Sequence, residues 1–153
     1  MWRSSKEGAL PIVIDGSSSA YTLHQLRPIL NEDEKNKFDS LAILDSVDFL
    51  HDIVLPSVQV KPLQKHIVLH PVCSLKKMKT ENKFVRIAKL LTTDVTVPNY
   101  AGCCGMAGDR GFLFPELTAS ATMPEALEVQ QKKYGGYYST TKTCELAMSE
   151  AVK

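Results

Sequence analysis

The order of the apolar segments constrains the fold of this 153-residue chain more than any other feature. Five short runs rich in Val, Ile and Tyr alternate with segments whose apolar residues recur at helical spacing. The runs lack strict polar alternation, as expected for strands covered on both faces. This pattern predicts an α/β domain with a mainly parallel sheet and helices on both faces. The predicted strands are Pro11–Ile14, Ser40–Leu44, Lys65–His70, Asp94–Val97 and Gly136–Thr140.

Helices are predicted between these runs. Val47–Val54 has an apolar face, with Ser46 as the expected N-cap and Pro56 beyond the end. The polar stretch Asn31–Asp39 is expected to form a solvated loop or an exposed helical turn. The other predicted helices are Phe84–Leu91, Met123–Tyr134 after a break at Pro124, and Cys144–Val152.

Length and charge narrow the class of protein. A chain of 153 residues fits one domain, and a formal net charge of +1 predicts no nucleic-acid partner. Polar Met1–Gly8 precedes the run Leu10–Ile14, which is too short for a signal segment or a membrane span. We therefore expect a cytoplasmic protein. In that reducing compartment four cysteines are more often ligands or redox thiols than disulfides.

The cysteines follow predicted strands. Cys73 lies just beyond the third strand, Cys103 and Cys104 lie in a loop beyond the fourth, and Cys144 begins the last helix. Because the carboxyl ends of parallel strands share one edge of a sheet, the four thiols are expected to meet there. They are the predicted metal ligands.

Local sequence supports a bound group at this edge. Gly102, Gly105 and Gly108 surround the double cysteine and would let the backbone approach a bulky ligand closely. Backbone N–H groups of that loop could donate to inorganic sulfur. The helix start at Cys144 favours the thiolate.

Other interpretations remain open for several residues. A buried cysteine can simply pack as a small hydrophobic side chain, and a structural zinc site usually has two C-x-x-C pairs, which this chain lacks. His70 is either a donor to the bound group or a partly buried structural residue. The lysines from Lys76 to Lys83 form either a solvated face or a surface for an acidic redox partner.

Two segments share a layout of strand, hydroxyl-rich turn and helix start. They are Ile12–Leu23 and Tyr137–Leu146, and their alignment places Ser19 where Cys144 falls. If the similarity is a true repeat, Ser19 begins a helix near the cysteine edge. Its hydroxyl is then expected to cap that helix.

The motifs at Cys73, Cys103-Cys104-Gly105 and Cys144 resemble the cysteine-rich CCG domain of heterodisulfide reductases, glycolate oxidases and flavin-linked lactate dehydrogenases. The stretch Ala101–Phe112, followed by Pro115-Glu116-Leu117, is most similar to the C-terminal part of FAD-linked D-lactate dehydrogenases. The resemblance covers nearly the whole chain. It implies one CCG domain over residues 1–153, with residues 1–30 resembling the tail of a preceding half-repeat.

The resemblance implies an iron–sulfur electron-transfer domain of an FAD-dependent oxidoreductase that acts on 2-hydroxy acids such as D-lactate or glycolate. It also implies a cluster of the 4Fe-4S type, held by Cys73, Cys103, Cys104 and Cys144. The FAD would belong to another domain or subunit, so the chain would not be catalytically complete alone. A further electron carrier would take the electrons, and partners could hold the protein at the inner membrane.

The chain departs from the family pattern at two positions. The last family motif is C-x-x-C, but Thr141 stands in place of its first cysteine, and Ser19 stands in place of the cysteine that closes the first half. Hydroxyls are poor iron ligands beside thiolates. Two alternative functions therefore remain open. One is a thiol–disulfide module in which Cys103 and Cys104 react, and the other is a metal-free scaffold that docks a partner.

Overall fold

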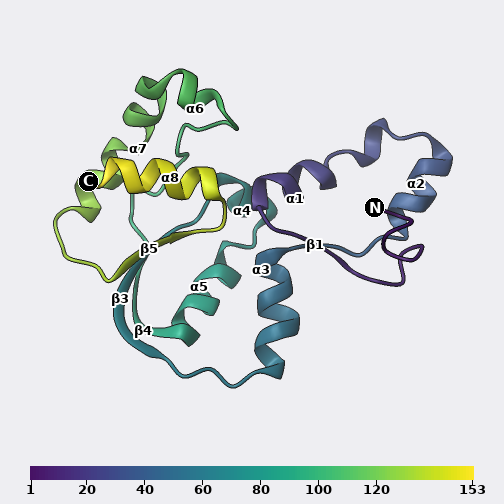
Figure 1. The fold of residues 1–153 in the computed structure, drawn as a ribbon, viewed down its shortest axis with the longest axis horizontal. Coiled ribbons are helices and arrows are strands. Elements are labelled where there is room, and N and C mark those ends of the chain that lie inside the picture. The colour runs from purple at the N-terminus through teal and green to yellow at the C-terminus, as the bar shows by residue number, and fades with distance from the viewer.

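The computed structural model describes all residues from 1 to 153 and contains five strands in two sheets (Figure 1). The first sheet pairs β1 (Ile12–Ile14) with β2 (Ile43–Asp45). The second has the order β4 (Thr92–Thr96), β3 (Leu63–His70) and β5 (Gly136–Ser139). Every pair is parallel. The α/β class and all five strands are confirmed, but the strands form two sheets where one was predicted.

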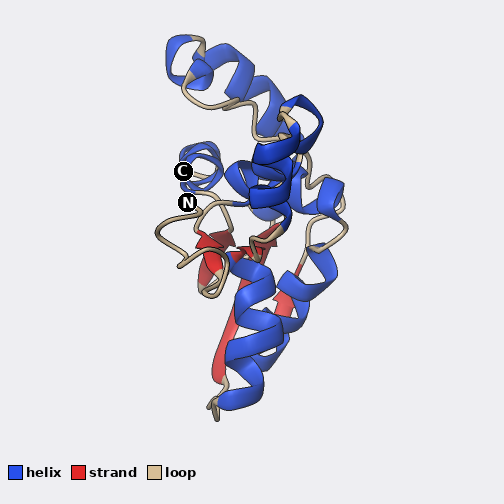
Figure 2. Cartoon of the chain, turned by 90° about the vertical axis from the view of Figure 1, so that its right-hand side faces the viewer, coloured by secondary structure: helices blue, strands red, loops and turns tan.

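Helices occupy most of the remaining chain, beside and above the strands (Figure 2). No helix is both long and apolar enough to cross a membrane. The α-helices are α1 (Ser17–His24), α2 (Glu32–Asp39), α3 (Ser46–Phe49), α4 (Cys73–Met78), α5 (Glu81–Leu91), α6 (Arg110–Leu113), α7 (Pro115–Val129) and α8 (Lys142–Ala151).

Both faces of the central strand β3 are covered. Successive side chains of a strand point to opposite faces. Ile67 and Leu69 pack in one apolar cluster with Ala88 of α5. His70 points to the other face, where its ring bonds Glu125 of α7. Helices therefore flank the sheet on both sides, as the apolar runs predicted.

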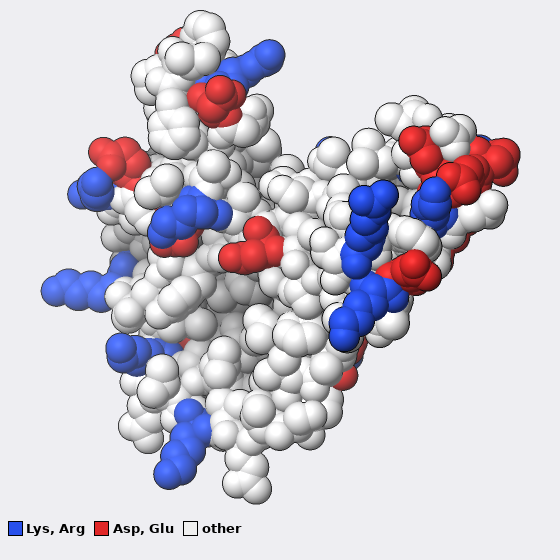
Figure 3. Space-filling model, turned by 45° about the vertical axis from the view of Figure 1, so that its right-hand side comes forward, with Lys and Arg blue, Asp and Glu red and all other residues white.

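The N-terminal unit, made of β1, α1, α2 and β2, contacts the rest of the molecule through α1 and through both of its strands, which pack against α3. Helix α1 packs against α4, and the Lys77 ammonium lies 5.1 Å from the centre of the Tyr21 ring. At the start of α1 the buried Ser17 hydroxyl donates to Thr140 Oγ1 at 2.9 Å. Positive and negative side chains are interspersed on the face drawn in Figure 3.

Residues Glu32–Asp39 form a helix, with Asn31 as its N-cap, where a loop or a single turn was predicted. The Asn31 side chain accepts from the Glu34 amide at 2.9 Å, and the Glu34 carboxylate accepts from the Asn31 amide at 3.0 Å. This reciprocal pair is a capping box, which satisfies two free amides at a helix start. Capping therefore allows an exposed, strongly polar segment to be helical.

The predicted break at Pro124 and the predicted cap at Ser46 were wrong. Helix α7 continues through Pro124, which is exposed, so water can reach the carbonyl that the missing N–H leaves without a partner. The helical path after α3 continues as a π-helix and then a 3-10 turn that contains Pro56. The N-cap of α3 is Asp45 and not Ser46, since the Asp45 carboxylate accepts from the Val47 amide at 2.8 Å.

Candidate functional site

The strand ends bring the cysteines to one edge of the second sheet. Strand β3 ends at His70, and Cys73 is the first residue of α4. Strand β5 ends at Ser139, and Cys144 is the third residue of α8. The loop after β4 carries Cys103 and Cys104. Because all three strands are parallel, these connections share the carboxyl edge, where open α/β folds build their sites.

Cys104 and Cys144 are in direct contact. Their Sγ atoms lie 2.8 Å apart, and both residues are buried in an apolar cluster with Val72, Met106 and Ala147. The separation exceeds the ~2.05 Å of a disulfide bond. It is shorter than the ~3.8 Å between two thiolates on one tetrahedral metal with ~2.3 Å bonds. The two cysteines are therefore in close contact and form no disulfide.

The two cysteines of this pair have opposite protonation preferences. The hydrogen bond from Cys144, aided by the amides of Met106 and Cys104 and by the charge of His70, lowers the pKa of Cys104 to about 6 despite its burial. The same hydrogen bond, followed by burial and the charges of the other three cysteines, raises the pKa of Cys144. The pair therefore holds one proton, on Cys144, near neutral pH.

Cys73 and Cys103 are both exposed residues at the same edge. Partial burial raises the pKa of the Cys73 thiol, because it disfavours the charged form. The negative charge of the neighbouring Cys103 thiolate raises it further. Cys104 adds a smaller effect in the same direction. All four thiols are therefore close enough to act on one another electrostatically, as two pairs: one buried and one exposed.

The unequal thiols should make the stability of the reduced, metal-free protein depend on pH. Between a folded pKa of about 6 for Cys104 and ~8.5 for an unfolded cysteine, the unfolded state binds more protons. The free energy of unfolding should therefore rise with pH across this window, and the Cys104 contribution should be lost as pH falls through about 6. Above ~8.5 it should fall again, because Cys144 keeps its proton only when folded.

Guanidinium unfolding at pH 6, 7, 8 and 9 under reducing conditions measures this dependence. A Cys104→Ala variant, which has no thiolate at that position, should lose the rise between about 6 and ~8.5. An equally steep rise in the variant would show that another group is responsible.

The three predicted cofactor-binding glycines have different local roles. Gly105 has a φ of 74°, and an added Cβ would lie 2.9 Å from the Leu117 carbonyl, so it permits the loop to pack against α7. The loop needs glycine at position 105 because a larger residue would collide with α7. Gly108 also has a positive φ but open space around it, and Gly102 adopts an ordinary backbone conformation. Gly105 and Gly108 therefore allow the turns of this loop through their positive φ angles.

The two similar segments have matching backbone layouts. Ser19 and Cys144 are each the third residue of a helix that starts three residues after a strand end. The two helix starts meet where Ser17 donates to Thr140. Ser19 itself is exposed, and no side chain caps α1, so the predicted capping role was wrong. Thr141 occupies the N-cap position of α8, and its hydroxyl is buried without a partner.

Several other residues of interest are used in structural contacts. The Lys76 ammonium donates to the Ala101 carbonyl and so ties α4 to the cysteine loop. Lys83 lies between Asp48 and Asp52, at 2.6 Å and 2.5 Å. The lysine run is therefore only partly available to a charged partner.

The structure adds two residues that the sequence did not point to. Glu125 and Tyr137 form a buried hydrogen-bonded group with His70. Glu125 lies directly after Pro124, where a helix break was predicted, so it carried no signal of an inward-facing position. His70 is fully buried, not partly buried as the structural interpretation held.

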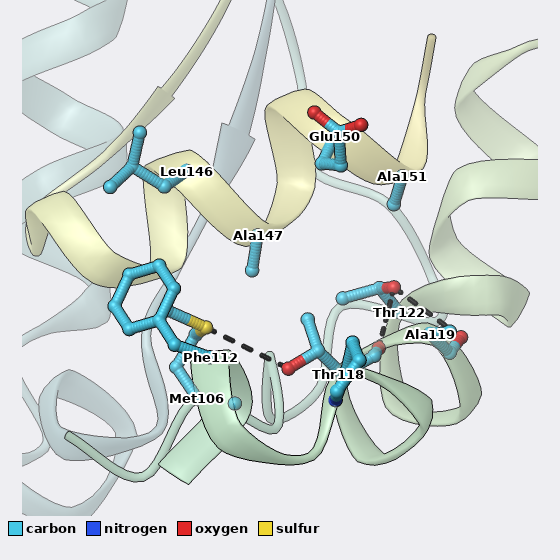
Figure 4. A pocket seen from close by; sticks show the side chains of 11 residues that line it. Met106, Phe112, Thr118, Ala119, Thr122, Leu146, Ala147, Glu150 and Ala151 are labelled. Atoms are coloured by element: carbon cyan, nitrogen blue, oxygen red, sulfur yellow. Dashed lines mark hydrogen bonds between the residues drawn. The ribbon is translucent and has the colours of Figure 1, made fainter. Parts of the chain in front are cut away.

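A cavity of about 530 Å³ lies beside the buried cysteine pair, between α8 and the α6–α7 segment (Figure 4). Met106 and Ala147, which line it, belong to the same apolar cluster as Cys104 and Cys144. Phe112 and Leu146 lie at this end, and Glu150 at the other. Its volume is in the range of small-molecule sites.

The donor set suits an iron–sulfur cluster in its chemistry but not in its present spacing. Four cysteines match the ligand count of a cubane cluster, and the backbone amides of Met106 and Cys104 contribute to the low pKa of Cys104. No three His, Cys, Asp or Glu side chains are arranged as they stand to hold a metal ion. Cys104 and Cys144, at 2.8 Å, would have to rotate apart to bind separate irons.

No protein-family model matches the chain, and no curated protein matches it. The resemblance to CCG domains therefore stays a prediction that rests on the cysteine motifs.

Proposed function

We propose that the chain is an electron-transfer domain that holds an iron–sulfur cluster of the 4Fe-4S type through Cys73, Cys103, Cys104 and Cys144. One observation carries the proposal: four thiols gather where three strands end, with Cys104 and Cys144 only 2.8 Å apart and with burial and then Cys103 raising the pKa of Cys73. Buried cysteines that serve only as packing would have no reason to gather in this way.

The residues of the chain have separable tasks in this function. Cys104 is already poised as a thiolate, the form that ligates metal, and the Met106 and Cys104 amides stabilise its charge. Cys144 anchors the site from the apolar interior. Cys73 and Cys103 face the surface, where a partner can approach. The cluster would supply reversible one-electron storage.

The family resemblance suggests what this domain serves. We assign it to an FAD-dependent oxidoreductase of a 2-hydroxy acid such as D-lactate or glycolate, with FAD on another domain or subunit. Electrons would pass from the flavin through the cysteine site to a further carrier. On this proposal the protein works in the cytoplasm, and its partners would link it to the inner membrane.

Anaerobic reconstitution with iron and sulfide tests the proposed function. We expect a brown protein with broad visible absorption and roughly four irons per chain, the content of one cubane cluster. The measurements are iron and sulfide content and the absorption spectrum after desalting. A colourless protein with less than about one iron per chain would contradict the proposal, since a Cys₄ cubane needs four.

A thiol–disulfide function is the second candidate, because Cys104 and Cys144 form a close pair with one low-pKa thiol. Such a pair could exchange with a disulfide substrate. Both residues are nearly inaccessible, at 4% and 8% exposure, so a substrate sulfur has little access to them. Rapid reduction of glutathione disulfide by the colourless reduced protein would favour this candidate over a cluster.

A further inference from the structure

The cavity between α8 and the α6–α7 segment is kept open by small side chains. Helices α7 and α8 pack against each other, and the cavity of about 530 Å³ lies beside that contact (Figure 4). Three of its lining residues on these helices are alanines: Ala119, Ala147 and Ala151. Protein interiors are close-packed and leave few spaces larger than a water molecule. The alanines therefore leave a space that larger side chains at the same positions would fill.

The wall of the cavity at α6 is closely packed. A Cβ added at Gly111 would lie 2.5 Å from Met106 Sδ and would also collide with the Thr118 hydroxyl. Only glycine therefore lets α6 approach the cysteine loop and α7 this closely. On this side the cavity is bounded by packed atoms, which hold its shape before any ligand enters.

The apolar side chains of the cavity suit an aromatic ring. Phe112 lies at its mouth, where it is 63% exposed, and Met106 lies inside at 3% exposure (Figure 4). An aromatic ring packs favourably on another ring, edge to face or offset, and on a thioether sulfur. The alanine methyl groups add apolar surface without filling the space. A ligand with a ring would therefore find favourable contacts on several sides.

The two hydroxyl groups of the cavity have already donated their protons. Thr122, which is 1% exposed, donates to the Thr118 carbonyl at 2.8 Å, and the Thr118 hydroxyl donates to Met106 Sδ at 3.7 Å. A hydroxyl has one proton to donate and two lone pairs to accept with. Both threonine oxygens therefore remain as acceptors. A ligand that bonds to them needs an N–H or O–H group of its own.

The cavity has no free charge for an ionic ligand. Glu150 is the one ionisable residue of its lining. The Glu150 side chain is 76% exposed, and its carboxylate pairs with the Lys153 ammonium at 2.5 Å. The pair is neutral overall and lies in solvent. A charged ligand would lose its hydration in the cavity without gaining a partner of opposite charge.

We propose that this cavity binds a small, neutral aromatic molecule that carries a hydrogen-bond donor, of the indole or phenol class. The ring would lie among the alanine methyl groups, against Phe112 and Met106, and its N–H or O–H group would donate to a threonine oxygen. The site goes beyond the proposed function, because its ligand requires neither a cluster nor a metal ion.

The first test titrates reduced, metal-free protein with indole. We expect saturable binding with a Kd below about 1 mM, measured by NMR from shifts of the Met106, Ala147 and Ala151 methyl signals. Two related probes test the predicted chemistry. 1-Methylindole has no donor and should bind about fivefold more weakly, the usual effect of one hydrogen bond. Indole-3-acetate is an anion and should bind more than about tenfold more weakly.

The second test fills the cavity. Ala119→Leu adds a large side chain at an exposed lining position of α7 and should weaken indole binding at least about tenfold, since the ring and the new side chain would overlap. Ser120→Leu is the matched control, because Ser120 is the next exposed residue of the same helix and does not line the cavity. Its Kd for indole should equal that of wild type. Ala151→Leu fills the cavity from α8 and should repeat the loss.

Three results would overturn the proposal. The first is that the Met106 and Ala147 methyl signals stay in place with indole above about 1 mM. The second is that both filled variants, folded as judged by their unfolding midpoints, bind indole as tightly as wild type. The third is equal affinity for indole and 1-methylindole. A protein that takes up no iron would refute the proposed function instead and would leave these results unaffected.

Discussion

Replacing Cys104 with alanine should lower the iron content of reconstituted protein from roughly four to less than one per chain. The contact with Cys144, at 2.8 Å between the Sγ atoms, and the nearby backbone amides lower the pKa of Cys104 to about 6. Its loss leaves three thiolates, one too few for a cubane held by four cysteines. Iron analysis and the visible spectrum after desalting measure the effect.

Ser74→Ala is the matched control for this substitution. Ser74 is buried at 4% exposure beside Cys73, and its hydroxyl has no partner, so the change removes a polar atom and no sulfur. Iron content in this variant should equal that of wild type. A Cys104→Ala protein that keeps its iron would show that the cluster, if present, is held elsewhere.

Leu69→Ala should have the largest effect on stability, a loss of about 2–5 kcal/mol in the free energy of unfolding. Leu69 is 1% exposed in the central strand of the larger sheet and packs with Ile67 and Ala88. Truncation would leave a cavity between the sheet and α5. A loss of this size is a large part of the total stability of an ordinary domain. Urea unfolding of the metal-free protein measures it.

Leu63→Ala provides the same chemical change on the same strand without burial. Leu63 is 60% exposed, so its truncation should cost less than about 0.5 kcal/mol, as is usual for surface positions. If the two variants were equally destabilised, the core assigned to the β3–α5 contact would be wrong.

The strands were predictable because burial on both faces leaves a strong signal in the sequence. Lys65–His70 contains the apolar run Ile67–Leu69, and it lies within β3, the one strand with two neighbours. The division into two sheets was not predictable. It depends on which strand edges pair, and apolar runs give no information about pairing partners.

The helices were predicted wrongly where amino-acid composition was a poor guide to local backbone structure. Asn31–Asp39 is too polar to show a buried face, yet a capping box stabilises it as a helix. Pro124 is a helix breaker by propensity, but it stands on the exposed side of α7, where breaking one hydrogen bond costs least.

The sequence predicted which cysteines gather at the candidate site, but not which of them are in contact. Strand-end positions and the double-cysteine motif predicted that Cys73, Cys103, Cys104 and Cys144 would gather, and the mutual pKa shifts agree with that prediction. Sequence alone does not specify that Cys104 contacts Cys144, because that pairing depends on side-chain packing in the apolar cluster. Glu125 and Tyr137 were missed for the same reason.

The parallel pairing of β3 with β5 also determines when, during folding, the cysteine site is completed. Cys73 and Cys144 come together only when β5, the last strand to be synthesised, pairs with β3. Such non-local parallel pairing forms late compared with local helices. The thiols therefore meet only in a nearly finished fold. On the proposed function, iron delivered to a nascent chain would meet isolated cysteines, so cluster loading would have to follow folding.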